Sequence, residues 1–324
     1  MKLVTYEFES ITRAGVVVDE QVVEIAPLLG EQRGLSDVRA FLELRGDPLT
    51  RLKSTLSSAQ PGEGLPLDRV RLRAPILRPP TVRDFMVYEG HASAGGTRQL
   101  SEAWYRLPIF YFSNPLCIFG PEDTVPYPSA SEQLDYELEL AAIIGRDAGN
   151  VTEADAFSYI AGFSIFNDWS CRDLQRDEME ARLGPAKGKD AASSLGPWIV
   201  TTDELAPFLR DGRLHVRCTL KVNGVQWMEN NAGIMVHSWG AMIERASRDS
   251  RVVPGDVLGS GTVTGGSIGE AIRSGYPARY LEPGDVVEIE VEGIGVLRNT
   301  IGSKASLDQN YRFKAPGETS RRSR

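Results

Sequence analysis

Hydrophobic and polar residues alternate over short runs through most of the chain, the pattern of half-buried β-strands. The first part holds two such segments, KLVTYEF and AGVVVDEQVVEIA, followed by one helical pattern at SDVRAFLELR. The adjacent Pro79 and Pro80 cannot sit inside a strand ladder or a helix, so they mark a connector. We therefore predict a small N-terminal α/β domain over residues 1–75 and a larger domain over residues 80–303.

The larger domain is also predicted to be built mainly from strands. Its β-type runs include YELELAAIIG, LGPWIVT, LHVRCTLKVNG and DVVEIEVEGIGVLRNTI. Asn223 and Gly224 follow one run directly, which predicts a tight hairpin turn. Two patches, TEADAFSYIAGF and HSWGAMIERAS, predict helices, and Thr152 is placed to cap the first. The expected fold class is α+β with a predominance of β-structure.

Composition and charge exclude several classes of function. The chain has 324 residues and a net charge of −8, which argues against a nucleic-acid partner because phosphate contacts need a basic face. No apolar run reaches the roughly 18 residues of a membrane helix, so no membrane partner is expected. The start MKLVTYEFES has no signal-peptide core, and three dispersed cysteines fit a reducing cytoplasm. The polar, basic residues 304–324 are expected to form a flexible tail.

The run DYELELAAIIG places two carboxylates inside an apolar segment. On a strand over residues 134–144, Glu137 and Glu139 point to the same face, because side chains two apart share a face. The remaining positions are apolar on both faces, which indicates a strand buried on both sides. Two neighbouring buried carboxylates need a cation or the protonation of one of them. A metal ion, a pair of basic side chains and a surface strand with its polar face in water all remain open.

A second segment, FNDWSCRDLQ, follows an apolar run with a dense group of polar residues. Asp168 would add a third carboxylate to Glu137 and Glu139, and such oxygen ligands suit Mg²⁺, Mn²⁺ or Ca²⁺. The alternative is that Asp168 caps a helix and pairs locally with Arg172.

Two further segments carry candidate catalytic groups. His91 lies in the small-residue stretch GHASAGG beside Asp84 and Glu89, where packing does not demand a histidine. Imidazole is a suitable general base at neutral pH because its ordinary pKa is near 6.5. Lys189, in GPAKGKDAASS, could point at a developing oxyanion from a glycine-rich turn. An exposed loop is the alternative for this lysine.

Together these stretches resemble the fumarylacetoacetate hydrolase family. The matching segments are DFMVYEGH, DYELELAAIIG, FNDWSCRDLQ, GKDAASSLGPW and GSGTVTGG, in the order and at the spacing of the family, over about residues 80–303. The resemblance implies a mixed β-sandwich roll carrying a smaller N-terminal domain, in a homodimer.

The resemblance also implies a role for each candidate residue. The ligands of a divalent cation, expected to be Mg²⁺ with Mn²⁺ or Ca²⁺ as alternatives, would be Asp84, Glu137, Glu139 and Asp168. The groups that carry the chemistry would be His91 as the base, Glu270 of GGSIGEA as its support, and Lys189. The residues that hold the substrate would be Tyr111, Arg172, Gln175 and Thr262.

The implied reaction is metal-dependent hydrolysis of a carbon–carbon bond in a small 2,4-diketo acid, of the fumarylacetoacetate or acylpyruvate type, in the catabolism of aromatic compounds. Met86 stands where the longer branch of the family has a tyrosine, and Ala94 where the shorter branch has a glutamate. A decarboxylase or a tautomerase or isomerase of a 2-oxo acid on the same scaffold therefore stays open. A non-catalytic metal-binding protein is a third hypothesis, against which His91 and Lys189 argue, because neither is needed to hold a cation.

Overall fold

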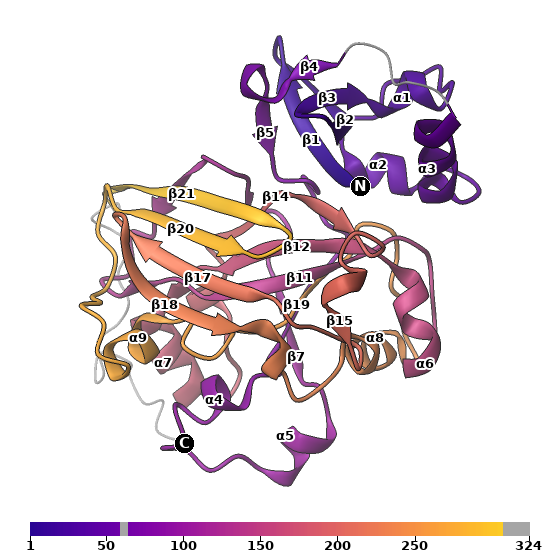
Figure 1. The fold of residues 1–324 in the computed structure, drawn as a ribbon. Coiled ribbons are helices and arrows are strands. Elements are labelled where there is room, and N and C mark those ends of the chain that lie inside the picture. Colours follow the sequence, from indigo (N-terminus) through magenta and orange to yellow (C-terminus); the bar gives the residue numbers. More distant parts are fainter. Residues whose placement is uncertain (59–63, 307–324) are drawn as a thin grey trace, which may run out of the picture.

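The computed structural model describes residues 1–58 and 64–306, and most of their regular structure is β-sheet. The strands of the larger sheet are β1 (Lys2–Phe8), β2 (Ile11–Val18), β3 (Gln21–Glu24), β4 (Leu65–Pro66), β5 (Arg71–Arg73), β6 (Val82–Phe85), β7 (Phe110–Ser113), β8 (Ile118–Phe119), β11 (Leu138–Ile144), β12 (Ile160–Asp168), β14 (Ser193–Thr201) and β19 (Val257–Gly259). They run in the order β4-β3-β2-β1-β14-β12-β11-β19-β6-β7, with β5 beside β1 and β8 beside β14 (Figure 1). Every residue of β11 and β12 is buried, as expected for central strands.

A second sheet packs against this one. Its strands, in spatial order, are β18 (Val225–Asn231), β17 (Arg217–Val222), β20 (Val286–Val291), β21 (Gly295–Lys304) and β9 (Thr124–Tyr127). The alternating side chains Val287, Ile289 and Val291 of β20 enter one apolar core together with Leu138 and Leu140 of β11. Two further strand pairs are β10 (Leu134–Asp135) with β13 (Ser170–Cys171), and β15 (Leu209–Arg210) with β16 (Arg213–Leu214). The α+β fold class with predominant β-structure is confirmed.

The helices are short and lie around the sheets. Those of the N-terminal segment are α1 (Ile25–Leu28), α2 (Val38–Leu42) and α3 (Pro48–Ser58). The others are α4 (Glu89–Ala92), α5 (Glu102–Arg106), α6 (Glu153–Ala156), α7 (Arg172–Glu180), α8 (Trp239–Ser247) and α9 (Ile268–Arg273). Helices α4, α7 and α9 gather at the lower left of Figure 1, below the second sheet.

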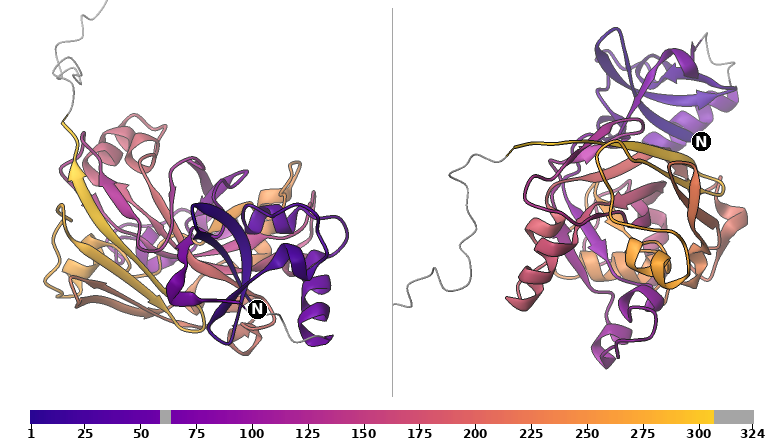
Figure 2. Two further views of the ribbon diagram at one scale, coloured as in Figure 1. Left: turned by 90° about the horizontal axis from the view of Figure 1, so that it is seen from above. Right: turned by 90° about the vertical axis from the view of Figure 1, so that its left-hand side faces the viewer.

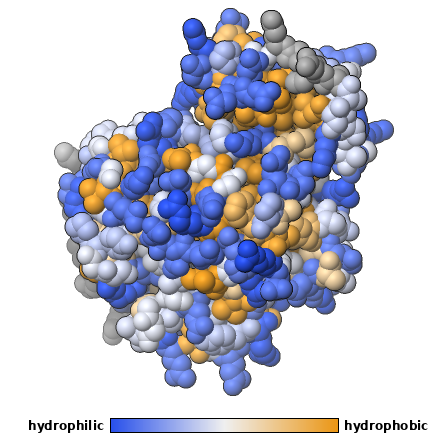
Figure 3. All heavy atoms as spheres, in the orientation of Figure 1, coloured by the Kyte–Doolittle hydropathy of each residue, from blue (hydrophilic) through white to orange (hydrophobic). Residues whose placement is uncertain are grey.

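The N-terminal segment extends the large sheet. Strand β1 pairs with β14 through Lys2 opposite Val200 and Leu3 opposite Ile199. Leu3 and Phe41 also share an apolar core with Ile199 and with residues of β11. The right-hand view in Figure 2 shows the segment at one end of the larger body, and Figure 3 shows hydrophobic side chains gathered on the face of the segment that it draws. The boundary between residues 75 and 80 stays a prediction.

Several local features agree with the sequence. Helix α2 lies inside the segment SDVRAFLELR, and α8 lies inside HSWGAMIERAS, as expected. The Thr152 side chain caps α6 by accepting from the Asp155 N–H. Asn223 and Gly224 both have positive φ, at 51° and 77°, as the tight turn between β17 and β18 requires.

Two local predictions are wrong. The strand expected over residues 134–144 is interrupted at Tyr136 and Glu137, because the Glu137 N–H donates to the Asn167 side chain at 3.0 Å instead of to a neighbouring strand. The helix expected in TEADAFSYIAGF ends at Ala156, and after a 3-10 turn the chain enters β12 at Ile160. Pairing of this apolar run with β11 and β14 outweighs its helical periodicity.

None of the helices in the described ranges is long and apolar enough to cross a bilayer. The three cysteines carry free thiols, as expected. The predicted flexible tail lies, beyond residue 306, outside the described residues.

Candidate active site

Four buried carboxylates converge at one end of the large sheet. Glu139 lies on β11, Asp168 ends β12, Asp84 lies on β6, and Glu137 lies in the interruption between β10 and β11. Each offers an oxygen, and these atoms all lie within 4.8 Å of one another. Since β11 and β12 are adjacent and β6 is separated from β11 only by β19, the topology unites segments far apart in the sequence.

A glycine in the intervening strand makes room for this cluster. Gly259 of β19 is paired with Ala141 on one side and with Asp84 on the other. A Cβ at this position would lie 2.7 Å from Asp84 Oδ1 and 3.0 Å from Glu139 Oε2. Any larger residue would therefore displace the carboxylates.

The cluster fits a divalent cation. Asp84 Oδ1, Glu139 Oε1 and Asp168 Oδ1 are buried and have no hydrogen-bond partner among the described residues. Unpaired buried oxygens are costly, so three of them at one point indicate a ligand that supplies positive charge. A set made only of carboxylate oxygens suits a hard ion such as Mg²⁺, Mn²⁺ or Ca²⁺.

The pKa values of the four carboxyl groups are shifted in different directions: three are raised and that of Glu137 is lowered. Burial, and then the neighbouring carboxylates, hold the pKa of Asp84 and of Glu139 well above the usual range. Burial also raises the pKa of Asp168, although Lys189 opposes this. Burial would raise the pKa of Glu137 as well, but Lys189 and Arg172 outweigh it and the pKa is lowered. Glu137 is thus compensated by protein cations, whereas the charge of the other three is not fully compensated.

Lys189 reaches the cluster from a 3-10 turn at Lys187–Lys189. Its Nζ lies 2.5 Å from both Glu137 Oε2 and Asp168 Oδ2, and the residue is only 4% exposed. Gly188 allows this close approach, because a Cβ there would lie 2.8 Å from the Cα of Gln175 in α7. The exposed-loop alternative for Lys189 is therefore wrong.

Arg172, at the start of α7, joins the cluster to a further acid. Its guanidinium donates to Glu137 Oε1 and to Asp135 Oδ2, both at 2.7 Å, and to Gln175 Oε1 at 2.9 Å. The other oxygen of Asp135 accepts from the Ile268 N–H, the first residue of α9. Asp135 thus links Arg172 to the helix that carries Glu270.

His91 and Glu270 form a pair beside the carboxylates. His91 Nδ1 lies 2.7 Å from Glu270 Oε2, and His91 Nε2 lies 3.6 Å from Glu137 Oε1. Burial would raise the pKa of Glu270, but the bond and the charge of His91 outweigh it and lower the pKa. Because Nδ1 is held by Glu270, Nε2 is the ring nitrogen that faces the cluster.

The two remaining candidate residues are Tyr111 and Thr262. The Tyr111 hydroxyl contacts Asp84 Oδ2 at 2.8 Å and Asp168 Oδ2 at 2.5 Å. Thr262 is buried, and its Oγ1 has no partner within the described ranges. All eleven predicted site residues are thus described, and contacts join ten of them at one site. Thr262 directly follows Gly261, whose N–H donates to Glu139 Oε2 at 2.9 Å. The role of each stays a prediction.

An open pocket of about 380 Å³ leads to the site. His91, Arg172, Gln175 and Glu270 line it, together with three charged residues that the sequence analysis did not select: Asp135, Arg176 and Arg273. Their spacing offered a signal, because Asp135 stands two residues before Glu137, Arg176 four after Arg172, and Arg273 three after Glu270. A charged residue one helical turn from a site residue shares its face.

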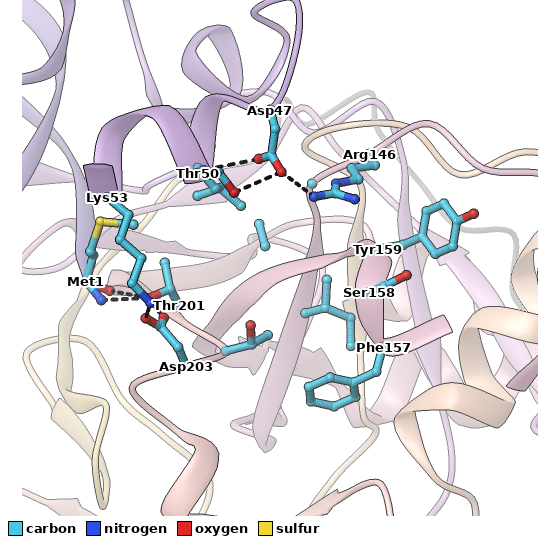
Figure 4. Close-up of a pocket in the computed structure, with 15 residues that line it drawn as sticks. Met1, Asp47, Thr50, Lys53, Arg146, Phe157, Ser158, Tyr159, Thr201 and Asp203 are labelled. Carbon is cyan, nitrogen blue, oxygen red and sulfur yellow. Dashed lines mark hydrogen bonds and ion pairs between the residues drawn. The ribbon is translucent and has the colours of Figure 1, made fainter. Parts of the chain in front are cut away.

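A second pocket, of about 230 Å³, lies between the N-terminal segment and the body (Figure 4). Its charged groups neutralise one another: Lys53 contacts Asp203 at 2.6 Å, and Arg146 contacts Asp47 at 2.6 Å. Because these ions are already paired, we assign the candidate active site to the carboxylate cluster.

Several known proteins are similar to this chain in sequence or in fold. Residues 81–302 match the family model described as fumarylacetoacetate (FAA) hydrolase C-terminal. The mitochondrial oxaloacetate tautomerase of Xenopus laevis is 31% identical over 265 residues, which are 82% of this chain and 78% of that protein. The fumarylacetoacetate hydrolase of Exiguobacterium antarcticum superimposes with a TM-score of 0.69 at 26% identity, covering 94% of this chain and 99% of that one. The 5-carboxymethyl-2-hydroxymuconate delta-isomerase of Mycobacterium smegmatis gives 0.66 at 25% identity, covering 93% and 99%.

Proposed function

This chain belongs to the fumarylacetoacetate hydrolase family, and on that premise we propose that it hydrolyses a carbon–carbon bond in a small 2,4-diketo acid with the help of a divalent cation. The observation that carries the proposal is the His91–Glu270 pair, in which Nδ1 contacts Glu270 and Nε2 faces the buried carboxylates. Hydrolysis needs a base that activates water, and this pair has the arrangement of such a base.

The cation we propose is Mg²⁺, with Mn²⁺ or Ca²⁺ as alternatives. Asp84, Glu137, Glu139 and Asp168 would hold it, and when bound it would polarise the keto oxygens of the substrate as a Lewis acid. The unpartnered oxygens of three of these residues support this assignment.

The protein's own groups account for the proton transfers. His91 Nε2 takes a proton from water, and Glu270 stabilises the resulting imidazolium through Nδ1. The water oxygen bonds to C4 of the diketo acid, the C3–C4 bond breaks, and its electron pair moves onto the C2 oxygen. Lys189 and Arg172, which both contact Glu137, would stabilise that negative charge. Protonation of C3 releases pyruvate, and the acyl part leaves as a carboxylate.

Tautomerisation of oxaloacetate is the second candidate, because the Xenopus laevis relative carries that name. It moves one proton between C3 and the C2 oxygen and consumes no water. The same His91–Glu270 pair could move that proton. A role in aromatic catabolism and a homodimeric state, both expected from the family, remain proposals.

Assaying both reactions on the same purified protein tests the proposal. With Mg²⁺ or Mn²⁺ present, release of pyruvate from acetopyruvate and of acetoacetate from fumarylacetoacetate would be followed beside the ultraviolet absorbance of enol-oxaloacetate. We expect C–C cleavage that is abolished by a chelator and lowered about 10² to 10⁴-fold in His91→Ala. Rapid equilibration of oxaloacetate without cleavage of any diketo acid would overturn the hydrolase and favour the tautomerase.

A further inference from the structure

Asp135 joins two segments of the active site through its carboxylate. It ends β10 and lines the pocket, but its side chain is only 2% exposed. Oδ2 accepts from the Arg172 Nε–H at 2.7 Å, and Oδ1 accepts from the Ile268 N–H at 2.9 Å. With both oxygens engaged, Asp135 is better placed to hold other groups than to act on a substrate.

The bond to Ile268 ties the main chain of α9 to β10. Ile268 is the first residue of this helix, and its side chain packs into the apolar core together with Ala271. In the described ranges, no other hydrogen bond joins the main chain of α9 to a residue outside 267–276. Packing keeps the helix on the core, whereas a directional hydrogen bond also fixes its position along and about its axis.

The position of the Ile268 N–H bears directly on the His91–Glu270 pair. Glu270 lies two residues beyond Ile268, which is about 3 Å along the helix axis. The contact between Glu270 Oε2 and His91 Nδ1 is 2.7 Å long. Groups that carry chemistry must be held within about 0.5 Å of their working geometry. A small displacement at the start of α9 would therefore disturb this contact.

Arg172 is the second group that Asp135 holds. The same guanidinium donates to Glu137 of the carboxylate cluster and to Gln175. Asp135 thus lies one contact from an arginine that reaches the cluster, and one contact from the helix that carries Glu270. No other side chain in the described part of the chain bonds both to Arg172 and to the main chain of α9.

We propose that Asp135 is a positioning residue, which sets the His91–Glu270 pair in place relative to Arg172 and the carboxylate cluster. Asp135 itself takes no part in the proton transfers. Its effect on turnover rests on the function proposed above, whereas its effect on the geometry of His91 does not.

Two substitutions separate position from charge. Asp135→Asn keeps the shape but offers one acceptor oxygen to two donors, so one of the two bonds is lost. Asp135→Glu keeps the charge and both acceptors but moves them by about 1.5 Å, one carbon–carbon bond. Both should lower kcat on a 2,4-diketo acid about 10- to 100-fold, with KM changed less. Full turnover in Asp135→Glu would overturn the positioning role, whether or not Asp135→Asn is impaired.

Asp173→Asn is the matched control. Asp173, on α7 beside Arg172, also ties a helix to another segment, because it accepts from the Ser131 hydroxyl at 2.6 Å and from the Glu132 N–H at 2.8 Å. Its loss should lower the melting temperature but leave kcat within about twofold of the wild type. An equal loss of kcat in Asp173→Asn would show that any loosened helix has this effect, and would contradict the inference.

A double-mutant cycle shows whether Asp135 acts through Glu270. If it does, Asp135→Asn should lower the kcat of the Glu270→Gln protein by less than about twofold, because residues that act through one contact are not additive. Effects that multiply in the double variant would mean that Asp135 acts elsewhere, and the proposal would be wrong.

A spectroscopic measurement is independent of the reaction. The chain has three histidines, His91, His215 and His237, so labelling histidine with ¹⁵N gives three sets of ring signals, and His91→Ala identifies one of them. The Nδ1 signal of His91 should shift in both Asp135 variants, the other two sets should stay in place, and Asp173→Asn should shift none. If the wild type cleaves no diketo acid, the proposed hydrolase fails and this measurement alone decides. Unshifted His91 signals in both Asp135 variants would overturn the inference.

Discussion

His91 Nδ1 lies 2.7 Å from Glu270 Oε2, although 179 positions separate the two residues in the chain. The sheet topology explains the contact. Strand β6, which leads into the His91 helix, pairs in parallel with β19, which leads toward the Glu270 helix. The carboxyl ends of parallel neighbours lie at the same edge of a sheet, so the segments that follow them meet.

Replacing Glu270 by glutamine should lower the turnover of a 2,4-diketo acid by about 10² to 10⁴-fold, because an amide cannot stabilise the imidazolium. Affinity for Mn²⁺, measured by calorimetry, should stay within about threefold of the wild type, because the four cluster carboxylates remain. Glu89→Gln is the matched control, since that carboxylate contacts the exposed Tyr105 hydroxyl and not His91. Near-wild-type turnover in Glu270→Gln would contradict the assignment.

Cation binding should release protons. Burial and like charges raise the pKa values of Asp84, Glu139 and Asp168, so the metal-free cluster holds protons that a cation must displace. The free state then binds more protons than the bound state, and affinity rises with pH, by about tenfold per pH unit for each proton displaced. Calorimetry of Mn²⁺ binding in two buffers with different ionisation enthalpies measures this release. Equal heats in both buffers would rule it out.

Gly259→Ala should damage the carboxylate cluster selectively. The added Cβ would lie 2.7 Å from Asp84 Oδ1, so the acids must shift, at a cost of about 1–3 kcal/mol of unfolding free energy. We expect Mn²⁺ to raise the melting temperature of the wild type and to have little effect on that of the variant. Gly34→Ala is the control, because a Cβ there meets nothing within 4 Å. An unchanged metal response in Gly259→Ala would argue against this geometry.

The link between α3 and the body should weaken in acid. Burial would raise the pKa of Asp203, but its hydrogen bonds with Lys53 and Thr201 lower it to about 2 (Figure 4). Because the unfolded value is about 3.9, the stabilisation is complete above about pH 4 and disappears as the pH falls to about 2. Urea unfolding should therefore show Asp203→Asn to be less stable than the wild type at about pH 6. The difference should shrink at about pH 3, and an equal difference at both pH values would count against the link.

Features that depend on neighbouring residues could be predicted from the sequence. The Thr152 cap, the Asn223–Gly224 turn and helix α8 each depend on contacts within a few residues. The candidate site residues were found because their segments, DYELELA above all, keep the spacing of a known family.

Features that depend on residues far apart in the chain were decided by the tertiary structure. The run from Ile160 is a strand because β11 and β14 supply its hydrogen bonds, and the chain breaks at Glu137 because Asn167 takes its N–H. No local pattern buries Lys189 between two carboxylates. Such contacts follow from the packing of whole sheets and helices. The free energy of a buried charge depends on all the groups around it, and residues far along the chain supply most of those groups.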